Sequence, residues 1–414
     1  MSNIAVLGYG VVGSGTVELF YKNKESIIKR AGKDLDIKYI LDIRDFPDSP
    51  FCDKFVKDIN IILNDSEVDI VAEVMGGVNP AYDFVSRCLK AGKSVITSNK
   101  ELVASKGAEL LKYAKENNCN FFFEASVGGA IPIIRPLHQC LAANEITACA
   151  GILNGTTNFI ITKMINEQMS FKDALSMAQQ LGYAEKDPTA DVEGHDACRK
   201  ICILASLIFG KHVYPEKVHT EGITAITRED VEYAENWGGA VKLIGSVKKL
   251  GNGKILPIVR PAFVPSSNPL SNISDVFNGI LVKGDAIDEV MFYGRGAGKF
   301  PTASAVVADI IDAAKHDKTS NSQTWEDSED SSFIEDYKNA LVSEYVRIFS
   351  KSRSNAVTEI SNLFGDVEYL ERDSKDNNEL AFITPKMKEN ELDEKLADLK
   401  EKGVDILGQI RILD

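Results

Sequence analysis

Residues 3–23 read NIAVLGYGVVGSGTVELFYKN and combine an apolar strand, a glycine-rich turn and a helix. The turn contains a complete GxGxxG pattern, made by Gly8, Gly10 and Gly13. Glycines at this spacing allow a tight turn and bring backbone N–H groups close to a pyrophosphate at a helix N-terminus, where the helix dipole favours an anion. The stretch therefore predicts a dinucleotide-binding βαβ unit at the start of the chain.

Strands and helices continue to alternate up to about residue 132. Apolar segments at residues 38–45 (KYILDIRD), 68–77 (VDIVAEVMGG) and 93–100 (KSVITSNK) each follow a helical segment and end in polar or glycine residues. A further apolar strand lies within residues 118–132. Because such alternation is typical of parallel βαβ crossovers, we predict an α/β fold with a Rossmann-type, doubly wound parallel sheet over residues 1–132.

The rest of the chain predicts four further parts. Residues 133–296 mix strands and helices and predict an α+β domain for catalysis and dimerisation, in which residues 240–250 (AVKLIGSVKKL) are expected to form a helix. Residues 297–318 contain a helix that packs back on the first domain. Residues 319–340 are polar and acidic, which predicts a linker. Residues 341–414 read as a compact βαββαβ unit of ferredoxin-like type, which the linker allows to pack apart from the catalytic body.

The composition is that of a soluble globular protein, and its acidic charge makes small molecules the expected ligands. Hydrophobic residues make up 44% and charged residues 26% of the 414 residues. The net charge of -14 argues against a nucleic-acid surface. No apolar run approaches the roughly 18 to 20 residues of a membrane span, and the N-terminus has no basic targeting region, so we expect a cytoplasmic protein. The seven scattered cysteines predict reduced thiols, and the five dispersed histidines do not predict zinc.

The end of the second strand bears on the choice of cofactor. An acid at this position binds the ribose 2′-hydroxyl of NAD, but the segment offers both Asp42 and Arg44. Arg44 can pair with a 2′-phosphate as a bidentate fork, which favours NADP without excluding NAD. The alternative, a solvated arginine beside Asp45, remains open.

Residues 182–200, GYAEKDPTADVEGHDACRK, lead directly into the apolar run ICILASLIF. Pro188 and Gly194 prevent a single helix, so the carboxylates project from a constrained loop. We expect acids of this loop to hold a cationic substrate group such as an α-ammonium; they are Glu185, Asp187 and Asp191.

A lysine at the end of the same motif predicts a proton donor. Asp196 begins the next helix and Lys200 lies one turn later on the same face, which continues as an apolar face. A partly desolvated ammonium beside an anion can stabilise and protonate an alkoxide that forms when a carbonyl is reduced by hydride. The alternative is an ordinary surface ion pair at the i,i+4 spacing.

Two more features lie at or near the carboxyl ends of strands, where open α/β sheets bind ligands. Lys100 follows Ser98 and Asn99 in SVITSNKELVA, which predicts either a catalytic lysine or an exposed residue that begins a helix. Glu124 precedes a glycine-rich turn whose free carbonyls predict a site for a hard monovalent cation or a plain interdomain turn.

Together these motifs resemble those of homoserine dehydrogenases. The resemblance rests on GYGVVG, TSNKELVA, EASVGGAIPII, GILNGTTNFI, GYAEKDPTADVEGHDACRK and GAGKFPTASAVVADI, and it covers about residues 1–318. It implies NAD(P)-dependent interconversion of L-aspartate 4-semialdehyde and L-homoserine in threonine, methionine and isoleucine biosynthesis. It also implies a homodimer or homotetramer.

The resemblance also implies roles for individual residues. Catalysis would use Lys200, Asp196 and Lys100. Substrate would contact Glu185, Asp191, Tyr183 and Thr156. NADP or NAD would contact Gly8, Gly10, Val11, Val12, Gly13, Arg44, Gly76, Ser98, Lys100, Gly182 and Gly298. A sodium ion would be held by main-chain oxygens of Glu124, Val127, Gly129 and Ile131.

The C-terminal unit is similar to ACT regulatory domains but lacks their Asp-x-Pro-Gly turn after the first strand, where this chain has SKSRSNAVTEI. We therefore expect the tail to serve in subunit association and threonine to inhibit weakly or not at all. Two rival functions remain possible from the sequence alone. One is a non-catalytic NAD(P) sensor, and the other is an amino-acid dehydrogenase acting on a C–N bond, which would need a carboxylate-binding arginine at the pocket.

Overall fold

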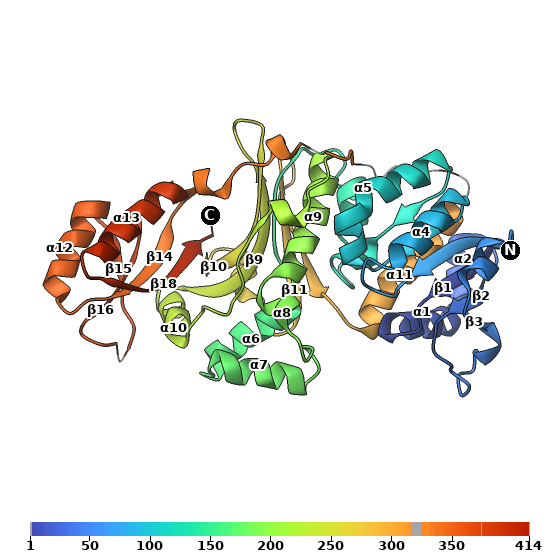
Figure 1. Cartoon of the computed structure of the whole chain (residues 1–414), viewed down its shortest axis with the longest axis horizontal. Coiled ribbons are helices and arrows are strands. Elements are labelled where there is room, and N and C mark those ends of the chain that lie inside the picture. The colour runs from blue at the N-terminus through green and yellow to red at the C-terminus, as the bar shows by residue number, and fades with distance from the viewer. Residues whose placement is uncertain (1, 317–318, 320–324, 329, 374, 414) are drawn as a thin grey trace.

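The computed structural model describes residues 2–316, 319, 325–328, 330–373 and 375–413. Figure 1 shows an elongated molecule with the N-terminal sheet and its helices at one end, the C-terminal unit at the other and a second sheet between them. Among the described residues, no helix combines the length and apolar character required to span a bilayer.

The first sheet confirms the predicted doubly wound arrangement. Its six parallel strands run in the order β3-β2-β1-β4-β5-β6, which reverses direction between β1 and β4 and so opens a ligand crevice at their carboxyl ends. The strands are β1 Ser2–Leu7, β2 Leu35–Leu41, β3 Phe55–Val56, β4 Val68–Glu73, β5 Ser94–Thr97 and β6 Phe121–Phe122. The helices are α1 Val11–Lys22, α2 Lys24–Ala31, α3 Ile59–Leu63, α4 Ala81–Lys90 and α5 Lys100–Glu116.

A helix from much later in the chain completes this layer. α11 (Lys299–Lys315) packs against α1 and α2. The approach is close, because a Cβ atom on Gly15 would lie 2.7 Å from Lys299 Cγ. Gly15 therefore allows α1 and α11 to touch along their backbones.

The second sheet is mainly antiparallel and has the order β12-β11-β7-β9-β10-β18-β14-β16-β15, with β8 beside β10. The strands before the C-terminal unit are β7 Ile146–Ile152, β8 His219–Thr220, β9 Gly239–Lys249, β10 Ile255–Pro265, β11 Phe277–Gly284 and β12 Asp288–Arg295. Its helices are α6 Gly155–Asn166, α7 Phe171–Gln180, α8 Thr189–Val192, α9 His195–Phe209 and α10 Arg228–Asn236.

The prediction of a helix at residues 240–250 is wrong, because this segment is the central strand β9. β9 pairs with both β7 and β10, and residues 241–245 are all buried. A strand covered on both faces does not alternate apolar and polar residues, so its spacing of apolar residues resembles that of a helix.

Apart from two additional strands of two residues each, at 341–342 and 387–388, the C-terminal unit follows the predicted βαββαβ order, but the expectation that it packs apart from the catalytic body is wrong. β18 pairs in parallel with β10 through Ala262–Arg411 and Phe263–Ile412, so one sheet runs through both parts. Its elements are β13 Leu341–Val342, β14 Glu344–Phe349, α12 Arg353–Phe364, β15 Glu368–Leu370, β16 Glu379–Ile383, β17 Met387–Lys388, α13 Glu389–Glu401 and β18 Asp405–Ile412.

Buried ion pairs reinforce this junction. The Arg260 guanidinium of β10 lies 2.6 Å from Glu389 Oε1 and 3.3 Å from Glu344 Oε1 of the C-terminal unit. Arg347 Nε lies 2.9 Å from Asp230 Oδ1 of α10. All of these side chains are less than one tenth exposed, so the unit is joined to the catalytic part by desolvated charges.

The segment predicted as a linker is also attached to the body where the structure describes it. Trp325 is buried with 4% of its surface exposed. Glu326 forms a bridge with Lys211, and Ile334 forms one with Ile255. Its composition predicted a linker or a poorly ordered loop, and these contacts hold the described part of it against the catalytic part.

Candidate active site

A cavity of about 690 Å³ lies where the carboxyl ends of the first sheet face helices α6, α8 and α9. It brings together most of the residues that the sequence predicted for one site, although they come from all parts of the first 300 residues. The predicted residues in its lining are Val11, Val12, Ser98, Lys100, Val127, Thr156, Gly182, Tyr183, Glu185, Asp187, Asp191, Asp196, Lys200 and Gly298.

The glycine-rich turn has the geometry that a dinucleotide requires. Gly8 has φ +97°, and a Cβ atom on Gly13 would lie 1.9 Å from Gly8 O, so both positions need glycine. A Cβ atom on Gly10 would meet no atom within 4 Å, which leaves open space at the N-terminus of α1. The turn is therefore tight on its inner side and open where a pyrophosphate would approach.

Asp196 lies between two lysines at the bottom of the cavity. Its Oδ1 is 2.5 Å from Lys100 Nζ, and its Oδ2 is 2.7 Å from Lys200 Nζ. Lys200 also donates a hydrogen bond of 2.6 Å to Leu153 O. Asp196 and Lys200 are 3% and 6% exposed, so the alternative of an ordinary surface ion pair is wrong.

An asparagine that the sequence did not single out supports this carboxylate. Asn154 Nδ2 donates to Asp196 Oδ2 at 2.8 Å and to Asp191 Oδ1 at 2.7 Å. Its Oδ1 caps α6 by accepting from Thr157 N at 2.8 Å. Asn154 therefore places two acids side by side while it begins a helix. Its position in GILNGTTNFI, before a helix that begins at a glycine, was the available signal.

The charges give the two lysines different properties. Burial, together with the Lys100 ammonium, lowers the pKa of Lys200 although Asp196 opposes this effect. Burial alone would lower the pKa of Lys100, but Asp196 raises it. Burial opposes ionisation of Asp196, yet the two ammonium groups hold its pKa well below the usual range. Lys200 is therefore the lysine that releases a proton more easily.

Other polar groups surround the open half of the cavity. Thr156 Oγ1 donates to Tyr183 O at 2.7 Å, and the Tyr183 ring lies edge-on to Phe159 with centroids 5.0 Å apart. Burial and the nearby Asp196 carboxylate raise the pKa of Asp191. Glu185 and Asp187 are exposed at the mouth. The cavity thus has a buried ionic end and an acidic, wetter entrance.

Comparisons with known proteins agree with this geometry. Residues 132–311 match the family model described as homoserine dehydrogenase, and residues 8–124 match the NAD-binding domain of homoserine dehydrogenase. The homoserine dehydrogenase of Bacillus subtilis (strain 168) is 38% identical over 392 residues, which cover 92% of this chain and 90% of that protein.

This chain belongs to the homoserine dehydrogenase family. The Corynebacterium glutamicum homoserine dehydrogenase is 36% identical over 97% of this chain and 93% of its own length. The crystal structure of a homoserine dehydrogenase from Thiobacillus denitrificans superposes with a TM-score of 0.89 at 33% identity, and covers 100% of this chain and 98% of that one.

A hyperthermophilic archaeal homoserine dehydrogenase mutant in complex with NADPH also matches, with a TM-score of 0.65 and 31% identity over 75% of this chain and 97% of that one. The family assignment makes the chain an NAD(P)-dependent oxidoreductase. It removes the two rival functions, a non-catalytic sensor and an amino-acid dehydrogenase acting on a C–N bond.

Two arginines, Arg199 and Arg295, also line the cavity, although the sequence singled out neither of them as a site residue. Arg199 pairs with Glu101 at 3.2 Å, and Arg295 is exposed. Ser126 and Thr302 were also missed. Arg295 ends β12 and Ser126 lies in a short turn, while Arg199 and Thr302 lie within α9 and α11, where no local pattern marks the residues that face the cavity.

Arg44 is exposed but its guanidinium is paired with Asp42. Its Nε and Nη2 donate to Asp42 Oδ1 and Oδ2 at 3.0 and 2.9 Å, while Asp42 Oδ2 also accepts from Tyr9 N at 2.8 Å. The alternative of a solvated arginine stays open, because the Arg44 side chain is exposed; Asp45 pairs with Lys57 at 2.6 Å and not with Arg44. Asp42 is thus tied to the glycine-rich turn and occupies the fork of Arg44.

The loop predicted to bind a cation is shaped by an internal carboxylate. Glu124 Oε1 accepts from Ile133 N and Ile134 N at 2.6 and 2.8 Å, and Oε2 accepts from Arg135 N at 2.8 Å. Hydrogen bonds within the loop end on Phe123 O and Gly128 O. Gly129 has φ +57° and lies against Gly296, which lines the cavity. Among the described residues there is no group of three histidine, cysteine or acidic side chains that could hold a metal.

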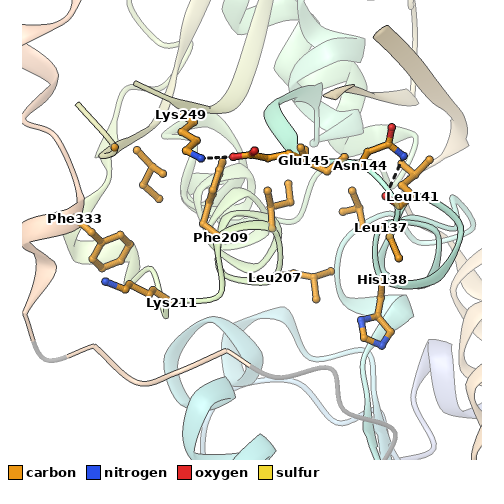
Figure 2. Close-up of a pocket in the computed structure, with 15 residues that line it drawn as sticks. Leu137, His138, Leu141, Asn144, Glu145, Leu207, Phe209, Lys211, Lys249 and Phe333 are labelled. Carbon is orange, nitrogen blue, oxygen red and sulfur yellow. Dashed lines mark hydrogen bonds and ion pairs between the residues drawn. The ribbon is translucent and has the colours of Figure 1, made fainter. Parts of the chain in front are cut away.

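A second cavity, of about 480 Å³, lies beyond the C-terminal end of α9. Figure 2 shows Lys249 and Glu145 paired on one side of it, and Phe209, Leu207 and Leu137 around an apolar space. Its lining includes none of the predicted site residues. This cavity therefore takes no part in the predicted chemistry.

Proposed function

We propose that this homoserine dehydrogenase reduces L-aspartate 4-semialdehyde with Lys200 as the proton donor. The observation that carries the proposal is the buried Lys200 ammonium, fixed by Asp196 and Leu153 O at one end of the cavity. A bound nicotinamide supplies the hydride to the aldehyde carbon. The carbonyl π electrons move to oxygen, Lys200 donates its proton there, and the neutral amine is then reprotonated from solvent.

Asp196 and Lys100, which form an ionic group with Lys200, prepare it for this step. Asp196 keeps the Lys200 ammonium charged until the alkoxide forms. Lys100 is a second catalytic lysine beside the nicotinamide position, and its positive charge lowers the pKa of Lys200. Substrate is held by the acids and hydroxyls at the cavity entrance; these are Thr156, Tyr183, Glu185 and Asp191.

The cofactor lies along the open side of the glycine-rich turn. Its contacts are Gly8, Gly10, Val11, Val12, Gly13, Arg44, Gly76, Ser98, Lys100, Gly182 and Gly298. Preference for NADP depends on Arg44 turning from Asp42 to a 2′-phosphate, and Asp42 remains available for the 2′-hydroxyl of NAD. The 59% exposure of the Arg44 side chain leaves it room to turn.

A sodium ion is proposed for the main-chain oxygens of Glu124, Val127, Gly129 and Ile131. The support is the donor set: carbonyl oxygens in a glycine-rich loop suit a hard cation, and the loop hydrogen bonds end on other carbonyls. Sodium would brace the loop against residue 296 on the cofactor side. Sodium that stays bound to the intact protein would be detected by elemental analysis after dialysis into potassium buffer.

The remaining proposals concern organisation. Residues 1–132 with 297–318 form the dinucleotide domain, 133–296 the catalytic and dimerisation domain, 319–340 the connection and 341–414 an ACT-like unit without an effector site. The protein is a cytoplasmic homodimer or homotetramer. Exposed Met291 and Tyr293 on the edge strand β12 support association, which light scattering after size-exclusion chromatography would measure.

The test of the reaction is NADPH oxidation in the presence of L-aspartate 4-semialdehyde, with homoserine identified as the product. We expect turnover by the wild type and little by Lys200→Ala. NADPH oxidation without homoserine formation would refute the proposed substrate.

A further inference from the structure

His212 and Trp325 form a contact between α5, which carries Lys100, and α9, which carries Asp196 and Lys200. His212 lies just after α9 and is 2% exposed. Its Nδ1 accepts from Trp325 Nε1 at 2.9 Å and from Ala108 N at 3.3 Å. Because both partners can only donate, Nδ1 carries no proton, and Nε2 must carry the proton and donate to Ala104 O at 2.8 Å. The neutral ring therefore satisfies every one of these contacts.

Trp325 fits against the backbone of α5. A Cβ atom on Gly107 would lie 2.5 Å from Trp325 Cζ2, so the indole occupies space that only glycine leaves free. The indole of Trp325 also meets the Phe123 ring edge-on, with the ring centroids 5.4 Å apart. Glu326 N donates to Gly210 O, and His212 N donates to Glu326 O, so the segment that carries Trp325 is attached directly to the end of α9.

The position of this contact relates it to Lys100. Lys100 is the first residue of α5, and Ala104 and Ala108 follow one and two turns later on the same face. At its N-terminus α5 meets α9 through Lys100 with Asp196 and through Glu101 with Arg199. At residues 104–108 it meets His212, which follows the other end of α9. The two helices are thus held together at two separate places.

We propose that His212 and Trp325 are positioning residues that clamp α5 on α9 and so hold Lys100 against Asp196 for the reaction. The proposal rests on the catalytic role proposed above for Lys100. Protonation of His212 would place a new N–H against two donors, so the clamp opens as pH falls. Burial lowers the pKa of His212. The charged and titratable neighbours are the carboxylates of Asp327 and Glu216 and the Tyr214 ring at 4.1 Å, whereas α5 presents only uncharged backbone.

Two variants open the clamp by different routes. Trp325→Phe keeps an aromatic ring but removes the donor to His212. Gly107→Ala adds a Cβ atom that displaces the indole. The substitution does not weaken α5 itself, because alanine favours a helix over glycine by about 1 kcal/mol. We expect each to lower kcat about 3- to 10-fold with the KM for NADPH changed less than 2-fold. A loss confined to the melting temperature, with kcat per folded enzyme unchanged, would refute positioning.

A spectroscopic measurement follows the clamp itself. The chain has two tryptophans, so Trp237→Phe leaves Trp325 as the sole indole and also serves as the matched control. In this variant we expect the Trp325 emission to shift to the red at the same pH at which kcat falls on the acid side. In His212→Gln, which cannot titrate, we expect both changes to vanish. Emission and kcat that titrate at different pH values would overturn the proposal. Absence of turnover in the wild type would instead refute the proposed reaction, because the emission change does not depend on it.

Discussion

Lys100 and Lys200 share the single carboxylate of Asp196, one on each oxygen. Lys100 belongs to the dinucleotide-binding layer and Lys200 to the catalytic helix α9, so this carboxylate joins the two halves of the cavity. The two lysines differ in burial, and this difference separates their proton affinities. Burial lowers the pKa of Lys200, while the pKa of the less buried Lys100 is raised.

Replacement of Lys200 tests the proton donor. We expect Lys200→Ala to retain cofactor binding and to lose about 10² to 10⁴ in kcat, the usual contribution of a positioned acid. Lys200→Arg should not restore the rate, because a guanidinium does not release its proton near neutral pH. Lys112→Ala, which removes an exposed i,i+4 pair with Glu116 on α5, is the control for an ordinary lysine. Near-normal kcat in Lys200→Ala would disprove the assigned role.

The pH dependence should have opposite signs in the two directions. Reduction needs charged Lys200, so its kcat should fall as pH rises through a lysine pKa below the ordinary 10.5. Oxidation of homoserine needs the neutral amine and should therefore become faster over the same range. Rate profiles in both directions, measured with saturating substrates, would give this value. If the two rates instead changed in the same direction with pH, the change would belong to a group other than Lys200.

The bridging amide of Asn154 can be separated from its role as a helix cap. Asn154→Asp keeps an oxygen for Thr157 N but replaces the donor to Asp191 and Asp196 by a third acid. We expect kcat to fall about 10- to 100-fold with a small change in melting temperature, since an aspartate is a good cap. Asn154→Ala should lower both. If Asn154→Asp matched the wild type in turnover, the bridge would have no part in catalysis.

The sequence predicted the parts of the site that follow strands or carry a fixed spacing. The glycine-rich turn, Lys100 after β5 and the pair Asp196 and Lys200 all depend on local geometry, which short-range chemistry determines. Asn154 and Arg295 reach the cavity only because β7 and β12 belong to the same sheet. Pairing between strands that are distant in the chain leaves no periodic pattern in the local sequence.

The same limit explains the errors in the fold. Helical spacing of Val241, Ile244 and Val247 was compatible with a strand once both faces of β9 were covered. The composition of residues 319–340 could not indicate that Gly107 leaves room for Trp325. Nor could the residues of β18 show that their partner is β10, more than a hundred residues earlier.

Cofactor choice depends on which partner Arg44 takes. If it turns to a 2′-phosphate, Arg44→Ala should raise the KM for NADPH about 10-fold or more and leave that for NADH nearly unchanged. Binding of NADH should not suffer, because Asp42 stays available for the 2′-hydroxyl. Arg30→Ala removes an exposed charge from the same domain and is the control. Equal changes for both cofactors would mean that Arg44 only supports Asp42.

The last prediction concerns the C-terminal unit. Removal of residues 341–414 would expose the Phe263 ring, which stacks on Tyr345 at 4.4 Å, and would leave buried Arg260 with Glu221 alone. Because removing one partner from a buried ion pair costs about 3 to 5 kcal/mol, and Arg260 loses two of its three carboxylates, we expect a chain ending at Ala340 to be poorly folded, even though it keeps Trp325. The full-length double variant Glu344→Gln with Glu389→Gln removes both carboxylates without exposing the sheet edge. It should be folded, but with a lower free energy of unfolding in urea. A truncated chain with the melting temperature and activity of the wild type would show that the continuous sheet and its ion pairs contribute little, and that the tail is an independent attachment after all.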